Sequence, residues 1–232
     1  MTNIITYLEK ILDKLADLLL PKENLVKDLE QLGPSELYTK LSPANNLDLE
    51  EDPTLPMKAL FSYRQPLCKQ AIWEIKFRGN KKLIHDFSLL LYGFIIDELE
   101  DLRSFHNFQN IILVPIPSSK SRQRERGFNQ CILLAEELIK IDREHQANNF
   151  TLVKDILIKN EETAHQSRTK HRRQRFENLK GCFLINKKYQ NLENLSFIII
   201  DDVITTGATM GEAIKTLKKS DAKKILGMAL AH

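Results

Sequence analysis

The sequence predicts an α/β protein in which helices flank a parallel sheet. Short apolar runs alternate along the chain with longer segments whose apolar residues recur at helical spacing, which is typical of strand–helix–strand units. The run 197–200, Phe-Ile-Ile-Ile, is apolar at every position, as expected for a strand covered on both faces. Two acids, a loop of threonines around one glycine and a helical segment follow it. Open α/β sheets bind their ligands at such strand ends.

Proline and glycine bound the first elements of this sheet. The run 59–63 is predicted as a strand, and a helix is predicted to begin at the proline that opens 66–77. The segment 78–80, Arg-Gly-Asn, interrupts the helical spacing, and a second helix is predicted over 81–99.

The remaining elements are recognised by their length and residue types, because short β-branched runs favour strands and longer amphipathic runs favour helices. Strands are predicted at 111–114, 151–158, 182–185 and 225–231, and helices at 128–141 and 210–219. Since strands and helices alternate, crossovers must join the strands, and the sheet is predicted to be parallel.

Residues 1–57 differ in character from the rest, and we expect them to form a small N-terminal helical lobe. Apolar residues recur there at helical spacing, at Ile4, Leu8, Ile11, Leu15 and Leu18. This predicted helix ends at Pro21, and a weaker helix is predicted over 23–32. The stretch 42–56 holds three prolines and a group of acids, so it is predicted to link the lobe to a main domain over 58–232.

Composition excludes several classes of protein. No apolar run reaches membrane-spanning length and the first residues lack a signal-peptide pattern, so membrane insertion is not expected. Cys68, Cys131 and Cys182 lie far apart and are expected to be buried thiols of a cytoplasmic protein. Residues 1–57 carry five lysines against eleven acids, whereas the whole chain has a net charge of +3. The basic residues are therefore concentrated in the main domain.

The segment 201–209 has the chemistry of a sugar-phosphate site. Backbone N–H groups of its loop and of the following helix N-terminus favour an anion, and Gly207 lets the backbone approach closely. Hydroxyl groups add further donors at Thr205, Thr206 and Thr209. Asp201 and Asp202 suit sugar hydroxyls better than phosphate, so a ribose 5-phosphate fits both halves of the segment.

The run 197–209 resembles the phosphoribosyl pyrophosphate (PRPP) signature of type I phosphoribosyltransferases: four apolar residues, two acids, two apolar residues and Thr-Thr-Gly-x-Thr. It is not a Walker A loop, because no Gly-x-x-x-x-Gly-Lys-Ser/Thr occurs in the chain. The resemblance implies the Rossmann-like fold of these enzymes. It also implies PRPP binding through Asp201, Asp202, Thr205, Thr206, Gly207, Ala208 and Thr209.

Further blocks are similar to the ComF family, phosphoribosyltransferase-like proteins associated with bacterial competence and DNA uptake. They are Lys-Phe-Arg-Gly at 76–79, Leu-Val-Pro-Ile-Pro at 113–117, and Arg-Glu-Arg-Gly-Phe-Asn-Gln at 124–130. A later block matches at Thr163, Gln166, Arg175, Asn178, Gly181 and Phe183. Members of this family usually begin with a zinc ribbon built on paired cysteines. Residues 1–57 contain no cysteine, so we expect no zinc there.

The resemblance implies a role for each part of the site. Asp201 and Asp202 would accept hydrogen bonds from the ribose hydroxyls and hold Mg²⁺ through water, and Lys120 would join them as a catalytic residue by neutralising the leaving pyrophosphate. The pyrophosphate would lie on the turn formed by Ser118, Ser119 and Lys120. A flexible loop would cover the site, with Gln166, Arg168, Arg172, Arg173 and Arg175.

Three interpretations stay open at this point, and the first two do not exclude each other. The first is a PRPP-binding protein that transfers phosphoribose to an unidentified acceptor. The second is a non-enzymatic DNA-uptake factor acting through single-stranded DNA or protein partners. The intact signature favours the first, and the basic stretches and the ComF resemblance favour the second. Hypoxanthine-guanine phosphoribosyltransferases carry an acid at the position of Thr205, so a 6-oxopurine acceptor is disfavoured. A module that senses a related sugar phosphate is a third interpretation.

Overall fold

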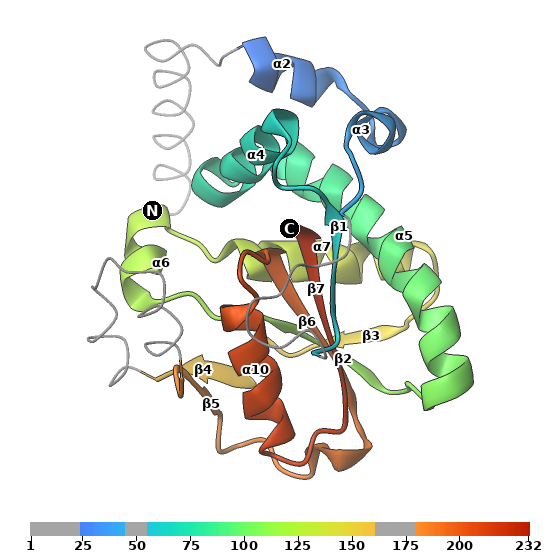
Figure 1. Cartoon of the computed structure of the whole chain (residues 1–232), viewed down its shortest axis with the longest axis vertical. Coiled ribbons are helices and arrows are strands. Elements are labelled where there is room, and N and C mark those ends of the chain that lie inside the picture. Colours follow the sequence, from blue (N-terminus) through green and yellow to red (C-terminus); the bar gives the residue numbers. More distant parts are fainter. Residues whose placement is uncertain (1–23, 45–54, 161–179) are drawn as a thin grey trace, which may run out of the picture.

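A five-stranded sheet forms the centre of the protein (Figure 1). The computed structural model describes residues 24–44, 55–160 and 180–232. The strand order is β1 (Met57–Phe61), β7 (Lys224–Ala231), β6 (Ser196–Val203), β2 (Ile111–Pro115) and β3 (Phe150–Leu152). Every neighbouring pair is parallel. The predicted parallel α/β sheet is therefore confirmed.

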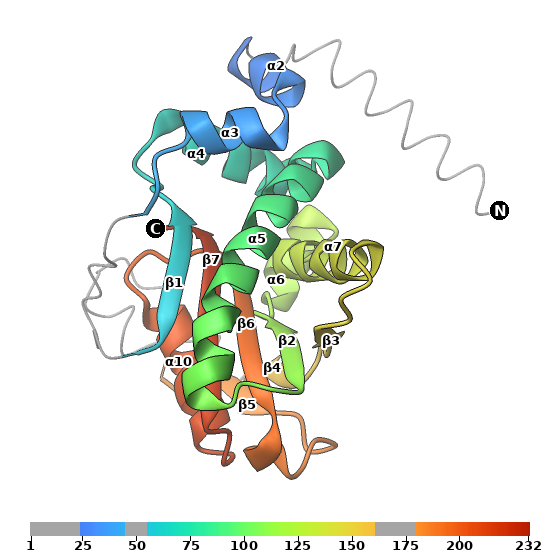
Figure 2. The ribbon, with the colours of Figure 1, turned by 90° about the vertical axis from the view of Figure 1, so that its right-hand side faces the viewer.

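Helices pack on both faces of this sheet (Figure 2). The long helix α5 (Lys81–His106) lies against α7 (Gln130–Glu144), and α10 (Ala208–Lys218) contacts β6 and β7. Successive side chains of β6 enter two separate cores, with Ile198 in the core of α5 and α7 and Ile199 in the core of α10. This double burial explains why the strand is apolar on both faces.

A separate antiparallel hairpin consists of β4 (Leu157–Lys159) and β5 (Phe183–Ile185). The prediction of one strand over 151–158 is wrong. In the structure β3 ends at Leu152 within the parallel sheet, and a turn precedes β4, which pairs elsewhere. An apolar pattern marks strand residues but does not identify the partner strand, so the break was not visible in the sequence. The predicted strand 182–185 exists and belongs to this hairpin.

Two short helices cover one end of the sheet, α2 (Asn24–Gln31) and α3 (Pro34–Lys40). Their fully buried side chains, Leu29 and Leu37, share the core that contains Phe61 of β1. The N-terminal helical residues thus contribute directly to the core of the main domain.

The helix predicted over 66–77 divides into α4 (Pro66–Trp73) and η1 (Glu74–Arg78), which is a π-helix. The π-helix ends at Gly79, whose φ of 58° lies in the left-handed region that favours glycine. Single π turns inside helices occur frequently at functional sites. This turn points Lys76 at the candidate site described below.

Several expectations concern segments outside the described residues. They are the helix predicted to end at Pro21 and residues 45–54 of the predicted linker. The weaker helix predicted over 23–32 is confirmed as α2. Three short helices were not predicted: α3, α6 (Lys120–Arg126) and η2 (Leu192–Asn194).

Candidate functional site

The carboxyl ends of β2 and β6 lie side by side because these strands are neighbours in the sheet. Pro115 is in register with Ile200, and the Ile116 N–H donates to the Ile200 carbonyl at 2.9 Å. Segment 117–120 follows β2 and segment 204–209 follows β6 at this end of the sheet, and Asp201 and Asp202 are among the last three residues of β6. The two parts of the predicted site, far apart in sequence, are thus brought together.

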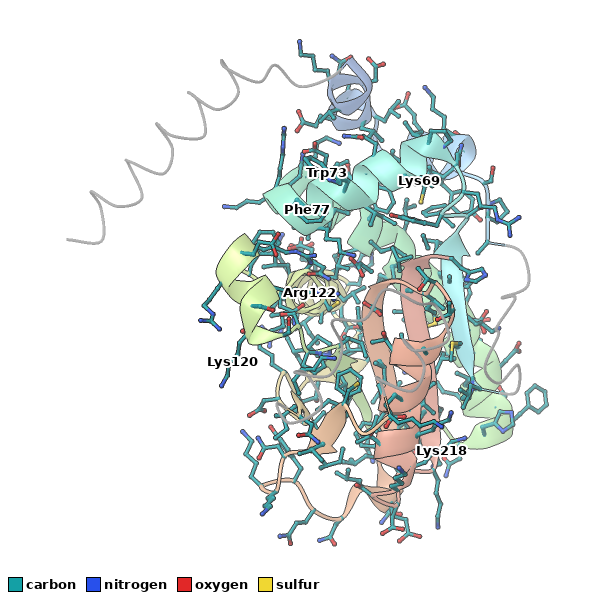
Figure 3. All side chains as sticks on the ribbon, turned by 60° about the vertical axis from the view of Figure 1, so that its left-hand side comes forward. Lys69, Trp73, Phe77, Lys120, Arg122 and Lys218 are labelled. Carbon is teal, nitrogen blue, oxygen red and sulfur yellow. The ribbon has the colours of Figure 1, made fainter. Side chains whose placement is uncertain are left out.

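The turn after β2 leads directly into a basic helix. Ser118 and Ser119 are half-buried, and Lys120 is exposed at the start of α6. Ser119 is the N-cap residue of this helix, and its Oγ accepts a hydrogen bond from the Arg122 N–H at 3.4 Å. Figure 3 shows Lys120 and Arg122 on α6, which also carries Arg124 and Arg126. The predicted pyrophosphate turn therefore lies within a concentration of positive charge.

The loop after β6 has the backbone conformation expected of a phosphate loop. Gly207 is the N-cap residue of α10 with φ 81°, a left-handed conformation that strains any residue with a side chain. The Ala208 N–H donates to Thr206 Oγ1 at 3.4 Å, and Thr205 is exposed. Thr209, in the first turn of α10, is half-buried. The N–H groups of the first turn, which have no carbonyl partner within the helix, and the helix dipole at this end of α10 favour an anion.

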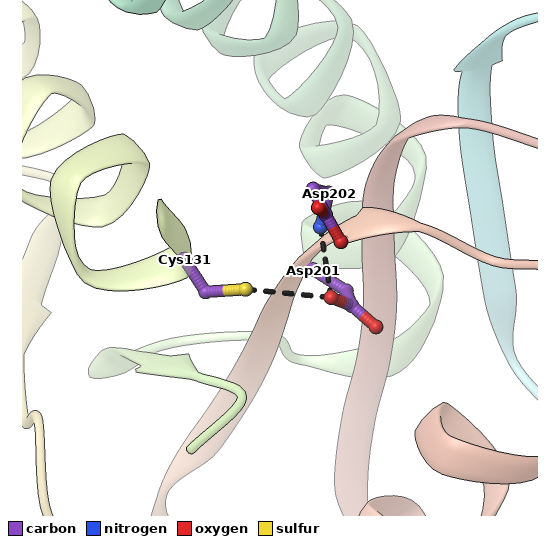
Figure 4. Close-up of side chains that lie close together, drawn as sticks. All are labelled: Cys131, Asp201 and Asp202. Carbon is purple, nitrogen blue, oxygen red and sulfur yellow. Dashed lines mark hydrogen bonds between the residues drawn. The ribbon is translucent and has the colours of Figure 1, made fainter. Parts of the chain in front are cut away.

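Asp201 and Asp202 lie buried at the end of β6 (Figure 4). Asp201 Oδ1 accepts hydrogen bonds from the Asp202 N–H at 2.9 Å and from the Cys131 thiol at 3.3 Å. Burial, together with the charge of Asp202, raises the pKa of Asp201 to about 8. Asp201 is therefore a carboxyl group that holds its proton up to neutral pH in the absence of a ligand.

Asp202 has a different set of partners. Its Oδ2 lies 3.2 Å from Lys76 Nζ and accepts a hydrogen bond from Gln130 Nε2 at 3.3 Å, while its Oδ1 accepts from the Val203 N–H at 3.0 Å. The adjacent acids therefore differ in their surroundings, since an ammonium group contacts Asp202 whereas a thiol and an amide contact Asp201.

Three residues that contact the two acids were not recognised from the sequence as part of the candidate site: Lys76, Gln130 and Cys131. Lys76 and Gln130 lie in blocks singled out only for their family resemblance, and no spacing rule connects η1 or α7 to the end of β6. Asn129 fixes the start of α7, because its Oδ1 accepts from the Cys131 N–H and its Nδ2 donates to the Ile116 carbonyl, each at 3.0 Å. This cap places Gln130 and Cys131 beside the two acids.

Within the described residues, Cys131, Asp201 and Asp202 bring ligand atoms within 4.8 Å of one another. Carboxylates are suitable partners for Mg²⁺. Burial raises the pKa of the Cys131 thiol well above its usual range, so the sulfur is a poor ligand. The bonds from Lys76 and Gln130 occupy Asp202 Oδ2, so the residues fit contact with Mg²⁺ through water rather than direct ligation.

The five residues of the predicted flexible loop, from Gln166 to Arg175, lie outside the described residues. The described chain shows where that loop is attached. Residues 161–179 connect β4 to β5. A backbone N–H of Gly181, at the base of the hairpin, donates to Glu212 Oε1 of α10 at 2.6 Å.

Comparison with known proteins identifies the class of protein to which the chain belongs. Residues 131–231 match the family described as "Phosphoribosyl transferase domain". Together with the parallel sheet and the two acids that end β6, this match defines a protein with a phosphoribosyltransferase-type domain. Over the described residues, no helix combines the length and the apolar character needed to cross a bilayer.

Three curated proteins define the family more closely. The chain is 30% identical over 174 residues to "Competence protein ComFC" of Bacillus subtilis. The aligned region covers 75% of this chain and 62% of the Bacillus protein, so the chain spans less than two thirds of that relative's length. It is 29% identical over 199 residues to "Competence protein F" of Haemophilus influenzae, covering 85% and 82%. It is 30% identical over 201 residues to "Competence protein ComFC" of Streptococcus pneumoniae, covering 85% and 77%. The chain belongs to the ComF family.

Proposed function

We propose that this protein binds PRPP together with Mg²⁺ in the cytoplasm and transfers its phosphoribose to an acceptor. The observation that carries the proposal is the continuous segment formed by two buried acids at the end of β6 and the left-handed Gly207 loop that caps α10. The acids suit the ribose hydroxyls, and the loop suits the 5-phosphate. The neighbouring turn at 118–120 supplies a place for the pyrophosphate.

Each residue has a defined task in this reaction. Asp201 and Asp202 bind the ribose hydroxyls and orient the sugar, with the ammonium group of Lys76 holding Asp202 in place. The reaction at the anomeric carbon passes through an oxocarbenium-like state, and negative charge builds on the departing pyrophosphate. Lys120 and Arg122 stabilise that charge from α6. Mg²⁺, held through water beside the acids, supplies further charge neutralisation when bound.

Calorimetric titration with PRPP and Mg²⁺ tests the proposal. Each charge-assisted hydrogen bond is worth on the order of 1.5–3 kcal/mol, so the double variant Asp201→Asn/Asp202→Asn should bind PRPP at least about tenfold more weakly. Asp221→Asn is the matched control, because Asp221 is exposed at the far end of α10 and its φ of 66° suits asparagine. Equal affinity of the double variant and the wild type would overturn the proposal. A screen for pyrophosphate release over nucleobases then identifies the acceptor.

A second candidate function, binding of single-stranded DNA during DNA uptake, is favoured by one surface. Trp73 and Phe77 are 43% and 41% exposed, and their ring centroids lie 5.5 Å apart. Arg78 lies 5.3 Å over the Trp73 ring and Arg126 lies 4.6 Å over the Phe77 ring. Figure 3 shows these aromatic residues above α6 with Lys120. Exposed rings stack on bases, and the surrounding cations attract phosphates.

The chain contains a single tryptophan, which makes Trp73 a specific reporter for this second function. Addition of a thymine-rich single strand should quench Trp73 fluorescence, and Phe77→Ala should weaken the binding by roughly 1–3 kcal/mol, the value of one stacked base. The quenching should decline steeply as salt is raised. Unchanged fluorescence at low salt would exclude this surface as a DNA site and would leave the PRPP proposal intact.

A further inference from the structure

Two aromatic side chains form an exposed apolar patch on the outer surface of α4 and η1. Trp73 is the last residue of α4, and Phe77 lies four residues further along, in η1. The residues are 43% and 41% exposed, and their ring centroids lie 5.5 Å apart. Ile72 and Ile75, their neighbours in sequence, are instead buried in the core. The helix thus buries one set of side chains and leaves the Trp73–Phe77 patch, defined by these two rings, exposed among the described residues.

The described chain begins beside this patch. The helix α2 starts at Asn24 and packs against α4. Figure 3 shows Trp73 and Phe77 below α2. Residues 1–23 precede α2 and lie outside the described residues. They therefore join the described fold at the end of the molecule that carries the Trp73–Phe77 patch.

The sequence of segment 4–19 requires a surface on which to pack. Its apolar residues recur at helical spacing and form a broad apolar stripe, made of Ile4, Ile5, Leu8, Ile11, Leu12, Leu15, Leu18 and Leu19. Most of the stability of a helix of this length comes from packing such a stripe against another element. The polar side carries both signs of charge rather than the Lys/Arg excess of membrane-surface helices, so the surface that it fits is protein.

The charges of the segment complement those around the patch. Three acids recur at a spacing of four and form one row along the predicted helix, Glu9, Asp13 and Asp17. Glu9 is three residues from Leu12 and four from Ile5, so this acidic row borders the apolar stripe. Arg78 lies 5.3 Å over the Trp73 ring, and Arg126 lies 4.6 Å over the Phe77 ring. An apolar surface edged by cations therefore matches an apolar stripe edged by acids.

The connection to α2 is short enough to hold the segment at this surface. Residues 20–23 span at most about 14 Å when fully extended, and a helix over 4–19 is about 24 Å long. Together they reach along the whole of α4, whose eight residues measure about 12 Å. A short tether gives the segment a local concentration on the order of millimolar. Below that protein concentration, the segment of the same chain outcompetes a second copy for the patch.

We infer that segment 4–19 forms a helix that packs its apolar stripe on the Trp73–Phe77 patch of its own chain, with the acidic row facing Arg78 and Arg126. This inference does not rest on the binding of PRPP. It adds a control to the second candidate function, because a single strand must displace the segment before its bases can stack on the two rings.

Trp73 fluorescence tests the inference directly, since the chain contains a single tryptophan. Leu8→Asp/Leu15→Asp places two charges on the apolar stripe of the full-length chain and should lower the docking equilibrium constant at least about a hundredfold. We expect the Trp73 emission maximum to move to longer wavelength and the acrylamide quenching constant to rise. Equal emission and equal quenching in the variant and the wild type would overturn the inference.

The matched control introduces the same residue type on the polar side of the segment. Lys10→Asp/Lys14→Asp should keep the Trp73 emission of the wild type. The same red shift in this control would show that added negative charge, rather than loss of apolar contact, changes the emission, and would contradict the inference.

Reversal of the acidic row tests the orientation of the helix. Glu9→Lys/Asp13→Lys keeps the apolar stripe and brings like charges toward Arg78 and Arg126. It should shift the Trp73 emission in the same direction but by less, and the shift should shrink as salt is raised. An unshifted emission at low salt would contradict the proposed orientation.

Dilution separates docking within one chain from docking between two copies. Trp73 emission that does not depend on protein concentration supports the inference. A red shift on dilution that accompanies dissociation of a dimer in sedimentation would assign the patch to a second copy and overturn it.

The candidate functions can be tested separately from this inference. Leu8→Asp/Leu15→Asp should leave the PRPP affinity unchanged, because no residue of the PRPP site is altered. A thymine-rich single strand should bind this variant more tightly than the wild type, because it no longer competes with segment 4–19. Equal DNA affinity of the two proteins, together with the emission shift, would reject the patch as a DNA site and retain the inference.

Discussion

At the scale of single residues, the two adjacent acids are chemically unequal. Asp202 contacts an ammonium group at 3.2 Å, whereas burial and the charge of Asp202 raise the pKa of Asp201 to about 8. The usual pKa of such a carboxyl is 3.8. Between these two values the folded chain binds more protons than the unfolded chain, so Asp201 lowers the free energy of unfolding as the pH rises through this window.

Asp201→Asn should therefore stabilise the unliganded protein. Asparagine Oδ1 keeps the hydrogen bonds from Cys131 and the Asp202 N–H, and the desolvated charge is removed. At a pH of about 8, we expect a gain on the order of 2 kcal/mol, or about 4–8 °C in Tm. The gain should shrink as the pH is lowered toward 4. A Tm below that of the wild type at the higher pH would show that the Asp201 carboxylate stabilises the fold.

Removal of the Lys76 ammonium group should have the opposite effect. Lys76→Met leaves the 5%-exposed Asp202 side chain without its cation, so the free energy of unfolding should fall by about 1–3 kcal/mol in urea denaturation. Lys58→Met is a matched control, because Lys58 is 49% exposed in its pair with Glu98 and should contribute less than about 1 kcal/mol. Equal losses in the two variants would contradict a special role for Lys76.

At the scale of elements, sequence periodicity predicted β6 and α10 well because their burial follows a simple pattern. Ile199 and Ile200 alternate between two cores, so the strand is apolar throughout. The π turn of η1 and the split of the segment 151–158 could not be predicted. Both depend on contacts with segments distant in sequence, such as Lys76 with Asp202 and β4 with β5.

The end of η1 can be tested through its terminating glycine. A Cβ atom on Gly79 would lie 3.1 Å from the Phe128 ring, and the backbone there is left-handed with φ 58°. Gly79→Ala should destabilise the protein by about 1–2 kcal/mol. Gly93→Ala, inside α5 where nothing lies within 4 Å of the added Cβ, should stabilise it by roughly 0.5–1 kcal/mol. If urea denaturation gave Gly79→Ala the same free energy of unfolding as the wild type, the end of η1 would not require a glycine at this position.

At the scale of the whole molecule, the site is assembled from elements spread along most of the chain. The acids and the loop of β6 were predictable because one continuous motif holds them. Lys76 of η1 and Gln130 of α7 were not, because the fold alone brings them to the end of β6. The sequence therefore predicts the segment 201–209 of the candidate site better than the groups that contact its two acids.

Hydrogen–deuterium exchange with and without PRPP and Mg²⁺ tests the central claim most directly. We expect slower exchange at backbone N–H groups of 204–211 and 118–122, because the phosphate groups of the ligand would bind there. The same protection should be reduced in Asp201→Asn/Asp202→Asn at a PRPP concentration just sufficient to saturate the wild type. Protection confined to other segments, or no protection at saturating PRPP, would contradict the assignment of this site.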